Sequence, residues 1–403
     1  MSGAVTGAVQ AAVSVSWPAG AGAPSAATQD IVAAVTDFIG AEAPDDQAFN
    51  ALALRLFAHQ YAHNAPLRAF CQRRGLTPRR VASWKDIPAV PIQAFKALAL
   101  SCEPVAACEA VFMTSGTTGA EQRGRHHHPT LSVWDLSMRR NFEARFLAGL
   151  PRGKDGRVPM AVLFPPATQL PHSSLARYLS QAVRLFGAND SGHFIGADGM
   201  DLDGLLGWLD RAQAGGQSVA MLGASYGFVH LADALAARGR AFALPAGSRL
   251  LDTGGYKRQS RDVPLPEFYA GLEQSLGVPP ARCINMYGMT ELSSQFYDAG
   301  NAVVPSVKQA PHWLRARVVD PLSGAELPDG QVGVLVHCDL ASFNSTTTLL
   351  TEDLGVRVEG GFHLLGRAEG AQARGCSLAV ESFLQAAGPQ AGAGAPTPPE
   401  ARA

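Results

Sequence analysis

The sequence predicts an α/β protein in which a mostly parallel sheet is flanked by helices and followed by a smaller β-rich region. Its 403 residues, 47% of them hydrophobic, are enough for a sizeable core. Between residues 106 and 312, short apolar runs alternate with amphipathic helical stretches, which is typical of a parallel sheet covered on both faces. From about Trp313 the helical spacing stops and strand-like runs follow.

Composition divides the chain into five segments. Residues 1–28 and 387–403 are rich in Ala, Gly and Pro, and we expect a disordered leader and tail because they bury too little side chain to offset ordering. The apolar spacing is helical from Asp30 to about Arg74, which predicts a helical N-terminal section over residues 29–105. Residues 106–312 predict an α/β core, and residues 313–386 predict a β-rich subdomain with a C-terminal arm.

Charge and cysteine usage exclude several classes of protein. The chain has 33 Lys and Arg against 34 Asp and Glu, which argues against nucleic acid or an anionic membrane surface as a partner. No apolar run of about 18 residues is free of Gly and Pro, so we expect no membrane span. The six cysteines form no CxxC pair and are interpreted as free thiols in a reducing compartment, which predicts a cytoplasmic protein.

The elements expected in the core follow each other in regular alternation. Five strands are expected at 110–113, 158–164, 218–222, 248–251 and 282–286. Five helices are expected at 131–148, 174–186, 202–214, 228–238 and 266–276. Three further strands are expected in RARVVD, QVGVLVHCDL and VRVEGGFHLLGRA. Ligands of parallel α/β folds bind beyond the carboxyl ends of strands, so we look for a site where strands run into loops.

The first motif is TSGTTG at Thr114–Gly119, directly after the strand expected at 110–113. Its glycines let backbone N–H groups approach a polyphosphate closely, while its hydroxyls can bind phosphate oxygens or a metal. No Gly-Lys-Ser/Thr follows, so it is not a Walker A loop. By itself the hexapeptide is equally compatible with an ordinary turn.

The second motif is YGMTE at Tyr287–Glu291, directly after the strand expected at 282–286. Tyr287 could stack on a base, Thr290 could hydrogen-bond a phosphate, and Glu291 could hold Mg²⁺, which prefers carboxylate and phosphate oxygens. Taken alone, the pentapeptide is more often a strand end with a capping Thr.

The third motif places Asp353 and Arg367 on either side of a hairpin turn at Gly360–Gly361. A carboxylate accepts hydrogen bonds from ribose hydroxyls, and a guanidinium donates to them. Taken alone, the segment is better explained as a surface Asp–Arg pair on a hairpin.

In this order and spacing, the three motifs resemble the adenylate-forming superfamily of acyl-CoA synthetases, luciferases and adenylation domains. The resemblance is closest to the acyl-protein synthetase (LuxE) family, through LPHSSL at 170–175, LLDTGGYK at 250–257 and GRAEGAQARGCSL at 366–378. It covers about residues 30–385. It implies the large-domain fold of adenylate-forming enzymes and an ATP-dependent ligase that activates a carboxylic acid, expected to be a fatty acid, as an acyl-adenylate. ATP and Mg²⁺ are the implied cofactors.

The same resemblance implies roles for individual residues. The ATP phosphates would be held by Thr114, Ser115, Gly116, Thr117, Thr118 and Gly119. The adenine would be bordered by Gly254, Gly255, Tyr287 and Gly288. The acyl pocket would be bordered by His172 and Ser173, although a structural His at a helix start is at least as good an interpretation. Thr290 would contact the adenylate phosphate as a catalytic residue, Glu291 would hold Mg²⁺, and Asp353 and Arg367 would bind the ribose.

Two departures from the superfamily pattern affect its lysines. The phosphate loop usually continues to a Pro-Lys pair, whereas here AEQRGR follows Gly119. Arg123, Arg125 or Lys257 would have to supply the missing cation, and we take Lys257 as the catalytic candidate. The usual small C-terminal domain, with its own catalytic Lys, is expected to be missing or truncated, because only 36 residues follow Arg367.

Cys376 is the candidate acceptor of the acyl group, because nothing expected in the chain positions coenzyme A in the usual way. Nine extended residues after Arg367, at about 3.3 Å each, could reach roughly 30 Å. A thiolate attacks an acyl-adenylate well, and Arg374 could lower the thiol pKa. The family's use of a C-terminal cysteine implies a thioester on Cys376 and onward transfer to an acceptor protein such as a reductase or carrier protein. The alternative is a small buried hydrophobe in a last helix.

Three other interpretations remain open. GASYG at Gly223–Gly227 fits GxSxG, which allows a serine acyltransferase or hydrolase with Ser225 as nucleophile and Asp353 and His363 as its partners. An aryl- or acyl-CoA ligase-like adenylating enzyme is the second. The third is a pseudoenzyme that binds nucleotide or acyl chains, because the usual lysines are absent.

The run His126–His128 is interpreted as a solvated loop rather than a metal site, because adjacent side chains project in different directions.

Overall fold

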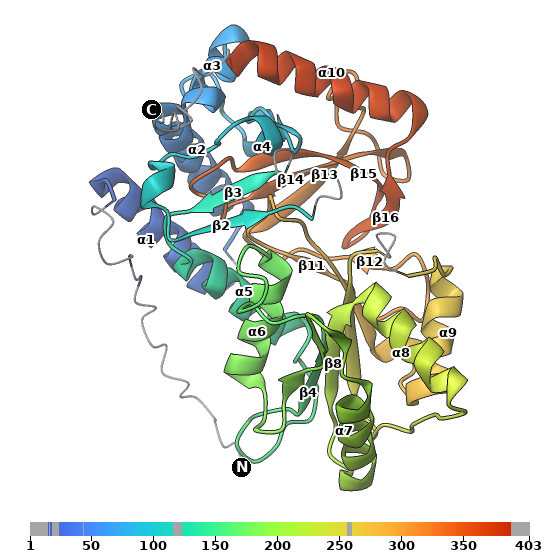
Figure 1. Cartoon of the computed structure of the whole chain (residues 1–403). Helices are drawn as coiled ribbons and strands as arrows, with labels where there is room; N and C mark the ends of the chain where they lie inside the picture. Colours follow the sequence, from blue (N-terminus) through green and yellow to red (C-terminus); the bar gives the residue numbers. More distant parts are fainter. Residues whose placement is uncertain are drawn as a thin grey trace, which may run out of the picture.

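The structure is a computed structural model that describes residues 15, 17, 24–42, 44–115, 123–255 and 260–387. Most of the expected leader, and the expected tail beyond residue 387, lie outside the described residues. The molecule has two lobes, which Figure 1 shows one above the other. The lower lobe holds the parallel sheet, and the upper lobe combines the N-terminal helices with the C-terminal strands and the last helix.

The lower lobe is built on a mostly parallel sheet, as the sequence predicts. Its strand order is β11 (Phe296–Tyr297), β10 (Cys283–Tyr287), β9 (Arg249–Thr253), β8 (Ala220–Ala224), β4 (Met160–Leu163) and β5 (Gly192–His193). The pairings from β10 to β5 are parallel, and β11 joins β10 antiparallel. A short antiparallel ribbon of β6 (Ile195–Gly196) and β7 (Gly199–Met200) follows β5.

Helices cover both faces of this sheet (Figure 1). One face carries α7 (Leu202–Gly215), α8 (Ser225–Ala237) and α9 (Leu265–Leu276). The other face carries α5 (Ser132–Arg145) and α6 (Ser174–Phe186). The two faces follow from the alternation of side chains along a strand: Ala161 and Leu163 pack into the first layer, whereas Met160 and Val162 pack into the second. Burial on both faces explains why these strands are continuous apolar runs in the sequence.

The upper lobe contains a second, mainly antiparallel sheet. Its strand order is β12 (Val307–Lys308), β16 (Gly361–Arg367), β15 (Thr348–Val358), β14 (Val332–Asp339) and β13 (Leu314–Val319), with β1 (Val90–Pro91) parallel to β15. The helices of this lobe are α1 (Ala26–Gly40), α2 (Asp46–His63), α3 (Ala65–Arg73), α4 (Ala94–Ala97) and α10 (Gly370–Ala387). Short 3₁₀ turns are η1 (Trp84–Asp86) and η2 (Val105–Ala107) here, and η4 (Pro280–Arg282) in the lower lobe.

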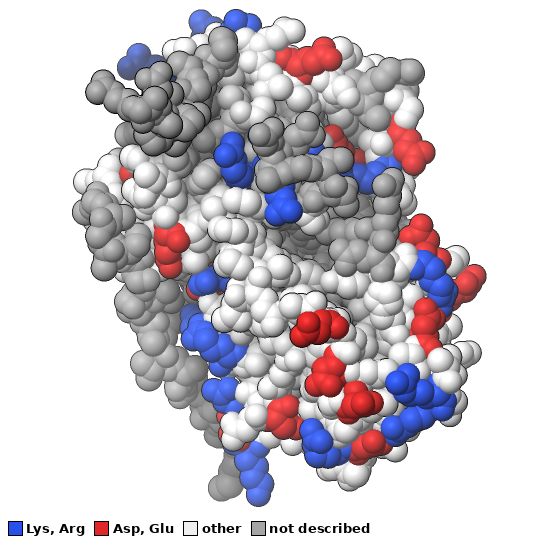
Figure 2. Space-filling view, viewed as in Figure 1, with Lys and Arg blue, Asp and Glu red and all other residues white. Residues whose placement is uncertain are grey.

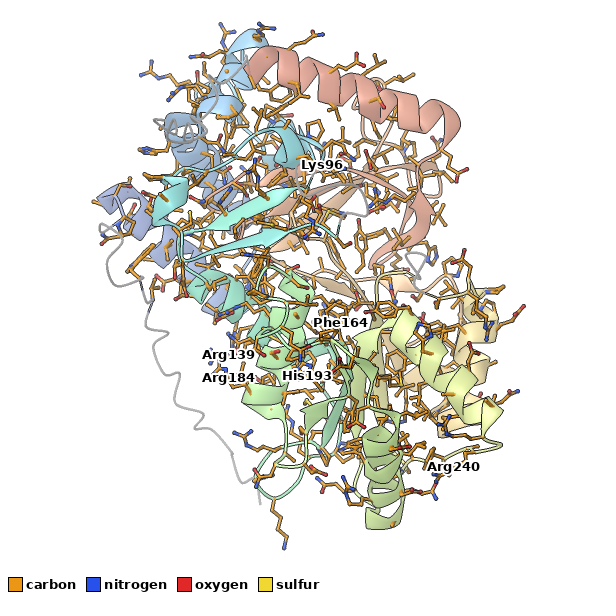
Figure 3. The ribbon with its side chains drawn as sticks, viewed as in Figure 1. Lys96, Arg139, Phe164, Arg184, His193 and Arg240 are labelled. Carbon is orange, nitrogen blue, oxygen red and sulfur yellow. The ribbon has the colours of Figure 1, made fainter. Side chains whose placement is uncertain are left out.

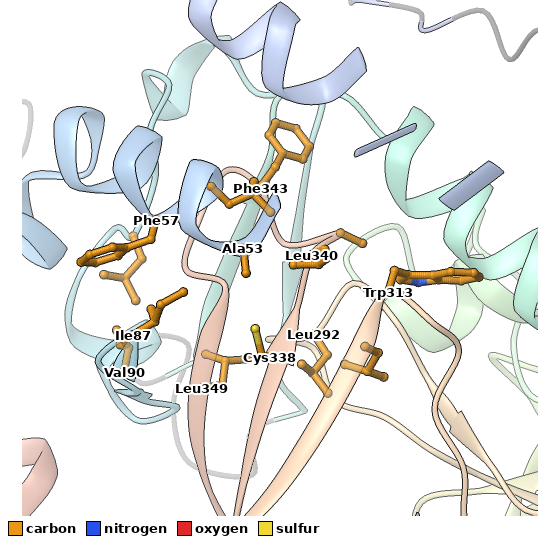
Figure 4. Close-up of a cluster of buried hydrophobic side chains, with 14 of the residues drawn as sticks. Ala53, Phe57, Ile87, Val90, Leu292, Trp313, Cys338, Leu340, Phe343 and Leu349 are labelled. Atoms are coloured by element: carbon orange, nitrogen blue, oxygen red, sulfur yellow. The ribbon is translucent and has the colours of Figure 1, made fainter. Parts of the chain in front are cut away.

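One apolar core joins the two ends of the chain in the upper lobe. Figure 4 shows Ala53 and Phe57 of α2 and Val90 of β1 gathered around Cys338 of β14 and Leu349 of β15. All five side chains are buried. The helices of segment 29–105 and the strands of segment 313–386 therefore stabilise each other, because each buries the apolar face of the other.

Two expectations from the sequence are wrong, both around β2 (Ala110–Met113). This strand does not join the parallel sheet but pairs antiparallel with β3 (Arg125–His128). The run His126–His128 is therefore a strand and not a solvated loop, and His126 and His128 are 1% and 3% exposed. Alternation along the strand turns both of these rings to the buried side, which a count of adjacent histidines does not convey.

The surface carries charges of both signs. On the face shown in Figure 2, acidic and basic side chains are intermixed over the lower half. This arrangement fits the net charge of -1. In the described part of the chain, no helix has both the length and the apolar composition needed to cross a membrane.

The docking of α10 can be tested through Phe383, which is fully buried with its ring centroid 4.6 Å from that of Phe70 in α3. Phe383→Ala should lower the free energy of unfolding by about 3 kcal/mol, because it leaves a cavity between the two helices. The control Leu378→Ala, on the same helix at 57% exposed, should change it by less than about 0.5 kcal/mol. Equilibrium denaturation in urea measures both, and equal values for the two variants would contradict the docked position of α10.

Candidate active site

The loop expected to hold phosphates is closed at its base by two residues, Thr114 and Gly124. The Thr114 amide donates to the Gly124 carbonyl at 3.0 Å, and the Gly124 amide donates to the Thr114 hydroxyl at 2.9 Å. Ser115 is exposed. The expected phosphate-binding residues that lie outside the described residues are Gly116, Thr117, Thr118 and Gly119. The structure therefore fixes the two ends of this loop.

The YGMTE segment lies against this base. Tyr287 ends β10, and the chain then turns through Gly288, which is exposed, to Thr290. His126 of β3 donates from Nδ1 to the Thr290 carbonyl at 2.9 Å. Its Nε2 accepts a hydrogen bond from the Ser345 hydroxyl, also at 2.9 Å. Burial lowers the pKa of His126 to about 4, so a neutral imidazole ties the second motif to the strand that leaves the loop.

Glu291 is buried beside the base of the loop, at 5% exposed. A Cβ atom added to Gly124 would lie 3.3 Å from Glu291 Oε1 and 3.1 Å from Thr114 Cγ2, so both side chains lie beside Gly124. Burial raises the pKa of Glu291 to about 7, and the positive charges of Arg367 and Lys96 oppose that rise. Glu291 and the base of the loop therefore lie together, and the charge of Lys96, which the motifs do not include, acts at the same place.

Lys96 lies on α4 and is exposed (Figure 3). In the sequence it is a single basic residue between the buried residues Phe95 and Leu98. The one feature of the sequence that could have drawn attention to Lys96 is a positive charge inside an apolar run. Nothing in the linear sequence connects this residue to the YGMTE motif.

Asp353 and Arg367 face each other across the predicted hairpin. They are paired in register on β15 and β16, with Arg367 Nε 3.3 Å from Asp353 Oδ1. The Tyr287 hydroxyl donates to Asp353 Oδ2 at 2.8 Å, so His337 Nε2, at 3.2 Å, must donate to the Tyr287 oxygen. Burial raises the pKa of Asp353, while Tyr287 and Arg367 oppose the rise. The third motif is therefore joined to the second.

The Tyr287 ring itself is enclosed. It is 8% exposed and packs against Phe296, Phe362 and His337 at centroid distances of 5.8, 5.9 and 5.6 Å. Its observed contacts hold Asp353 in place, and they leave little of the ring for stacking on a base. A role of Tyr287 at the adenine stays a prediction.

Glu352 connects the hairpin to the N-terminal part of the chain. Gln93, the residue before α4, donates to Glu352 Oε1 at 2.7 Å, and Arg367 donates to Glu352 Oε2 at 2.7 Å. One carboxylate thus holds the side chain expected at the ribose and the start of the helix that carries Lys96.

Asp339, at the end of β14, fixes the chain after Glu291. Its carboxylate accepts hydrogen bonds from the Ser293 amide at 2.8 Å and the Ser294 hydroxyl at 2.7 Å. Asp339 is fully buried, and these donors stabilise its charge where water cannot. The position of Glu291 is therefore set on one side by β10 and on the other by the upper sheet.

Gly254 and Gly255, expected at the adenine, follow β9 and are exposed. Gly254 has a φ of 73°, which favours glycine, and the chain turns there at the carboxyl edge of the sheet. Lys257, the expected catalytic cation, lies outside the described residues.

The structure does not assemble the alternative catalytic triad on Ser225. Ser225 is 4% exposed and donates to Asp252 Oδ2 at 2.9 Å. Asp353 is bonded to Tyr287, and His363 Nδ1 contacts the Ser306 carbonyl at 3.2 Å. Within the described ranges, the partners of the Ser225 hydroxyl are Asp252, Thr253 and Gly254 and include no histidine, so the base that this triad requires is not in place. The GxSxG turn instead allows close packing, because a Cβ atom at its first or last glycine would lie 2.8 Å from the Leu163 carbonyl oxygen.

The residues expected at the acyl pocket make structural contacts. Ser173 caps α6 by accepting from the Ala176 amide at 3.1 Å. The His172 ring contacts the Val111 carbonyl at 3.1 Å, and the His172 carbonyl accepts from the Met113 amide at 2.8 Å. These bonds attach the PHSSL segment to β2, so it lies next to the strand that enters the phosphate loop. Contact with an acyl chain stays a prediction.

Cys376 is buried in α10 rather than carried on an extended arm. The helix begins at Gly370, so the reach estimated for an extended chain does not apply to this conformation. The thiol is 3% exposed and lies 3.7 Å from the carbonyl of Thr351, two residues before Asp353 on β15. Burial raises its pKa, and Glu352 and Asp353 raise it further. The side chain of Arg374 lies outside what the structure describes.

A metal ion at this site would need the substrate as a second source of ligands. Within the described ranges, no three His, Cys, Asp or Glu side chains are grouped to bind a metal. Glu291 nevertheless fits Mg²⁺, because it is a buried carboxylate beside a loop expected to hold phosphates. Mg²⁺ is usually bound by one or two carboxylates together with substrate phosphates and water.

The burial of Glu291 can be tested through the pH dependence of stability. The carboxyl group ionises near 4.5 when exposed and near 7 in the folded protein, so stability is lost as the pH rises through that interval. Without metal or nucleotide, Glu291→Gln should be more stable than wild type at pH 8, by up to about 3 kcal/mol, and should approach it near pH 4.5. Urea denaturation at both pH values measures this. An equal effect from Glu381→Gln, an exposed control, would contradict it.

The chain is similar in sequence or in fold to several known proteins. In Vibrio harveyi, a long-chain-fatty-acid–luciferin-component ligase is 23% identical over 339 residues, which are 82% of this chain and 86% of the relative. The crystal structure of 2-hydroxyisobutyryl-CoA ligase in an open conformation, with 2-HIB-AMP and CoA, has a TM-score of 0.59 and 19% identity, and the match covers 80% of this chain and 69% of that one. In its thioesterification state the same ligase has a TM-score of 0.58 and 21% identity, with 80% and 68% covered.

The predicted fold class is confirmed by these structures, since their likeness extends over most of the chain. A family model described as acyl-protein synthetase, LuxE, matches residues 23–385. The prediction of an acyl ligase enzyme is confirmed at the level of the family: the chain belongs to the acyl-protein synthetase (LuxE) family.

Proposed function

We propose that this protein uses ATP to activate a carboxylic acid, expected to be a fatty acid, as an acyl-adenylate. The observation that carries the proposal is the meeting of the three motifs: Tyr287 bonds Asp353, Asp353 pairs with Arg367, and Glu291 lies against the base of the phosphate loop. Groups that suit a ribose, a metal ion and phosphates in one place fit MgATP.

The chemistry needs ATP because a carboxylate resists nucleophiles. In the proposed first step a carboxylate oxygen attacks the α-phosphorus, a new O–P bond forms, and the bond to the bridging oxygen of pyrophosphate breaks with its electron pair. The acyl group then carries AMP as a leaving group. The protein supplies position and electrostatic stabilisation, since negative charge moves onto the leaving phosphates.

The residues of the candidate site have separate roles in this proposed step. Asp353 accepts from the ribose hydroxyls and Arg367 donates to them. The Thr290 hydroxyl contacts the α-phosphate, held there by the bond between its carbonyl and His126. Glu291 would hold Mg²⁺, which when bound neutralises charge on the phosphate oxygens. Lys257 stays a predicted contact to the phosphates.

The acid is proposed from the relatives and not from a pocket. The printed name of the Vibrio harveyi relative, a long-chain-fatty-acid ligase, supports a fatty acid. An aromatic acid is the alternative. A screen of pyrophosphate release over fatty and aromatic acids tests the proposal, because a hydrolase or a pseudoenzyme would release none with any acid.

The proposed second step transfers the acyl group to Cys376. The thiolate attacks the adenylate carbonyl, a C–S bond forms, AMP leaves with the electron pair of the broken C–O bond, and the thiol proton passes to solvent. An acceptor protein, such as a reductase or carrier protein, then takes the acyl group. The thiol lies 3.7 Å from the carbonyl of Thr351, two residues before Asp353 on β15, but the step needs α10 to expose it.

The position of α10 is compatible with such a movement. Gly366 and Gly370, just before and at the start of the helix, have φ values of 111° and 59°. Glycines tolerate a change of chain direction that other residues resist. All six cysteines are free thiols, which supports the proposal that the protein works in the reducing cytoplasm.

The role of Glu291 in catalysis can be measured directly. Glu291→Ala should lower acid-dependent ATP–pyrophosphate exchange at least about a hundredfold, the scale of one lost electrostatic contact in a preorganised site. Glu381→Ala on the exposed side of α10 serves as the control. Exchange at a near wild-type rate in Glu291→Ala would refute the assignment.

The role of Cys376 is separable from adenylation. Cys376→Ser, incubated with ATP, Mg²⁺ and radiolabelled acid, should still release pyrophosphate in the first turnover but carry no hydroxylamine-labile label. Cys338→Ser, a buried thiol on β14, is the matched control and should keep the label. Label retained on Cys376→Ser would remove this cysteine from the mechanism.

A further inference from the structure

The fold brings α4 to the candidate active site by pairing the strand before it with β15. Val90 and Pro91 of β1 are in parallel register with Leu349 and Leu350, and the Ile92 amide donates to the Leu350 carbonyl at 3.0 Å. Asp353 follows three residues later on the same strand. The chain therefore enters α4 at a position fixed relative to the expected ribose-binding carboxylate.

The body of α4 then packs on the base of the phosphate loop. A Cβ atom added to Gly124 would lie 3.6 Å from Phe95 Cβ as well as 3.3 Å from Glu291 Oε1. Phe95 is fully buried, and its ring centroid is 5.6 Å from that of His126. Because Phe95 is packed at the base of the loop, the backbone of the next residue, Lys96, also lies near the base of the loop.

Lys96 is the described lysine whose charge is available to this site. Lys85 pairs with Glu326 at 3.0 Å, and Lys308 is buried in a pair with Asp298 at 2.8 Å. Within the described ranges Lys96 makes no ion pair. Its side chain is exposed, and its charge acts on Glu291. An ammonium group on a flexible four-carbon stem can reach a phosphate from such a position.

The arginine nearest to the loop in β3 faces the other way. Arg125 and His127 share one face of the strand, and the charge of Arg125 acts on His127. His126, on the opposite face, is the residue that bonds the Thr290 carbonyl. Arg125 is therefore directed away from Thr290 and Glu291, whereas α4 lies on their side.

We infer that Lys96 binds the phosphates of ATP and supplies the cation that the phosphate loop lacks. This inference rests on the proposed adenylation and adds a ligand contact to it. The ammonium group would offset the negative charge that collects on the pyrophosphate as the α-phosphorus bond breaks. Lys96 would then enter the site from the N-terminal section, whereas the other proposed contacts come from the core and the C-terminal hairpin.

The test compares Lys96→Ala and Lys96→Arg with Lys154→Ala, which removes an exposed lysine before β4 at the other end of the parallel sheet. In acid-dependent ATP–pyrophosphate exchange, Lys96→Ala should lose about a hundredfold in kcat/KM for ATP. Lys96→Arg should recover at least tenfold of that, and Lys154→Ala should match wild type. Thermal unfolding should keep Lys96→Ala within about 2 °C of wild type, because an exposed side chain is lost.

A binding measurement keeps this inference separate from the proposed function. Calorimetric titration gives the affinity of each protein for MgATP and for adenosine, without any acid. The ratio of the two affinities should fall at least tenfold in Lys96→Ala while adenosine binding stays unchanged. If wild type shows no exchange with any acid, the proposed function fails, and this ratio still decides on Lys96. An unchanged ratio, or exchange within threefold of wild type, overturns the inference and returns the role to Lys257 or Arg123.

Discussion

The hydrogen bond from Tyr287 to Asp353 is the contact on which the candidate site depends, because it joins the parallel sheet to the upper sheet at the point where the motifs meet. Tyr287 ends β10 of the parallel sheet, and Asp353 lies in β15 of the upper sheet. Both groups are buried, so the bond cannot be replaced by water, and a shift between the sheets would leave two polar groups unpaired. The bonds from Ser293 and Ser294 to Asp339 repeat the constraint a few residues later. Asp353 and Glu291, the residues proposed to bind the ribose and the metal, are held at one spacing as a result.

Buried carboxylates in this structure fall into two kinds. Asp252 accepts from Ser225, Asn285 and Tyr269, and Asp339 accepts from the segment after Glu291, so their charges are stabilised by fixed donors. Among the described residues, Glu291 accepts from its own backbone amide, and no side-chain donor contacts its carboxylate. Burying a charge with so few partners costs stability, and folds keep such a group mainly where a ligand completes its surroundings. That contrast separates a candidate ligand-binding acid from acids that hold the fold.

The sequence predicted the elements that follow from local residue patterns. It did not predict the contacts between segments that lie far apart in the chain. The helix at 174–186 and the Asp353–Arg367 pairing followed from apolar periodicity and from the glycine turn between two strands. The pairing of Ala110–Met113 with a histidine strand could not be predicted, because a short apolar strand gives no indication of its partner. The proximity of Lys96 to Glu291 could not be predicted for a similar reason. It depends on the pairing of β1 with a strand from the other end of the chain. The sequence therefore brought the motif residues together, whereas it did not indicate that Lys96 lies near them.

The burial of Cys376 has a consequence for the order of the proposed steps. In the docked form the thiol is enclosed and its pKa is raised, so the reactive thiolate is scarce while α10 lies on β15. The proposed adenylation uses Asp353 and Arg367 of the β15–β16 hairpin, and the helix that covers the thiol packs on that same hairpin. An enzyme that exposed the thiol only when α10 leaves β15 would keep the nucleophile away from other electrophiles until an acyl-adenylate is present. The thiol contacts Thr351, two residues before Asp353, and the glycines at 366 and 370 lie where the chain would have to bend for α10 to leave β15.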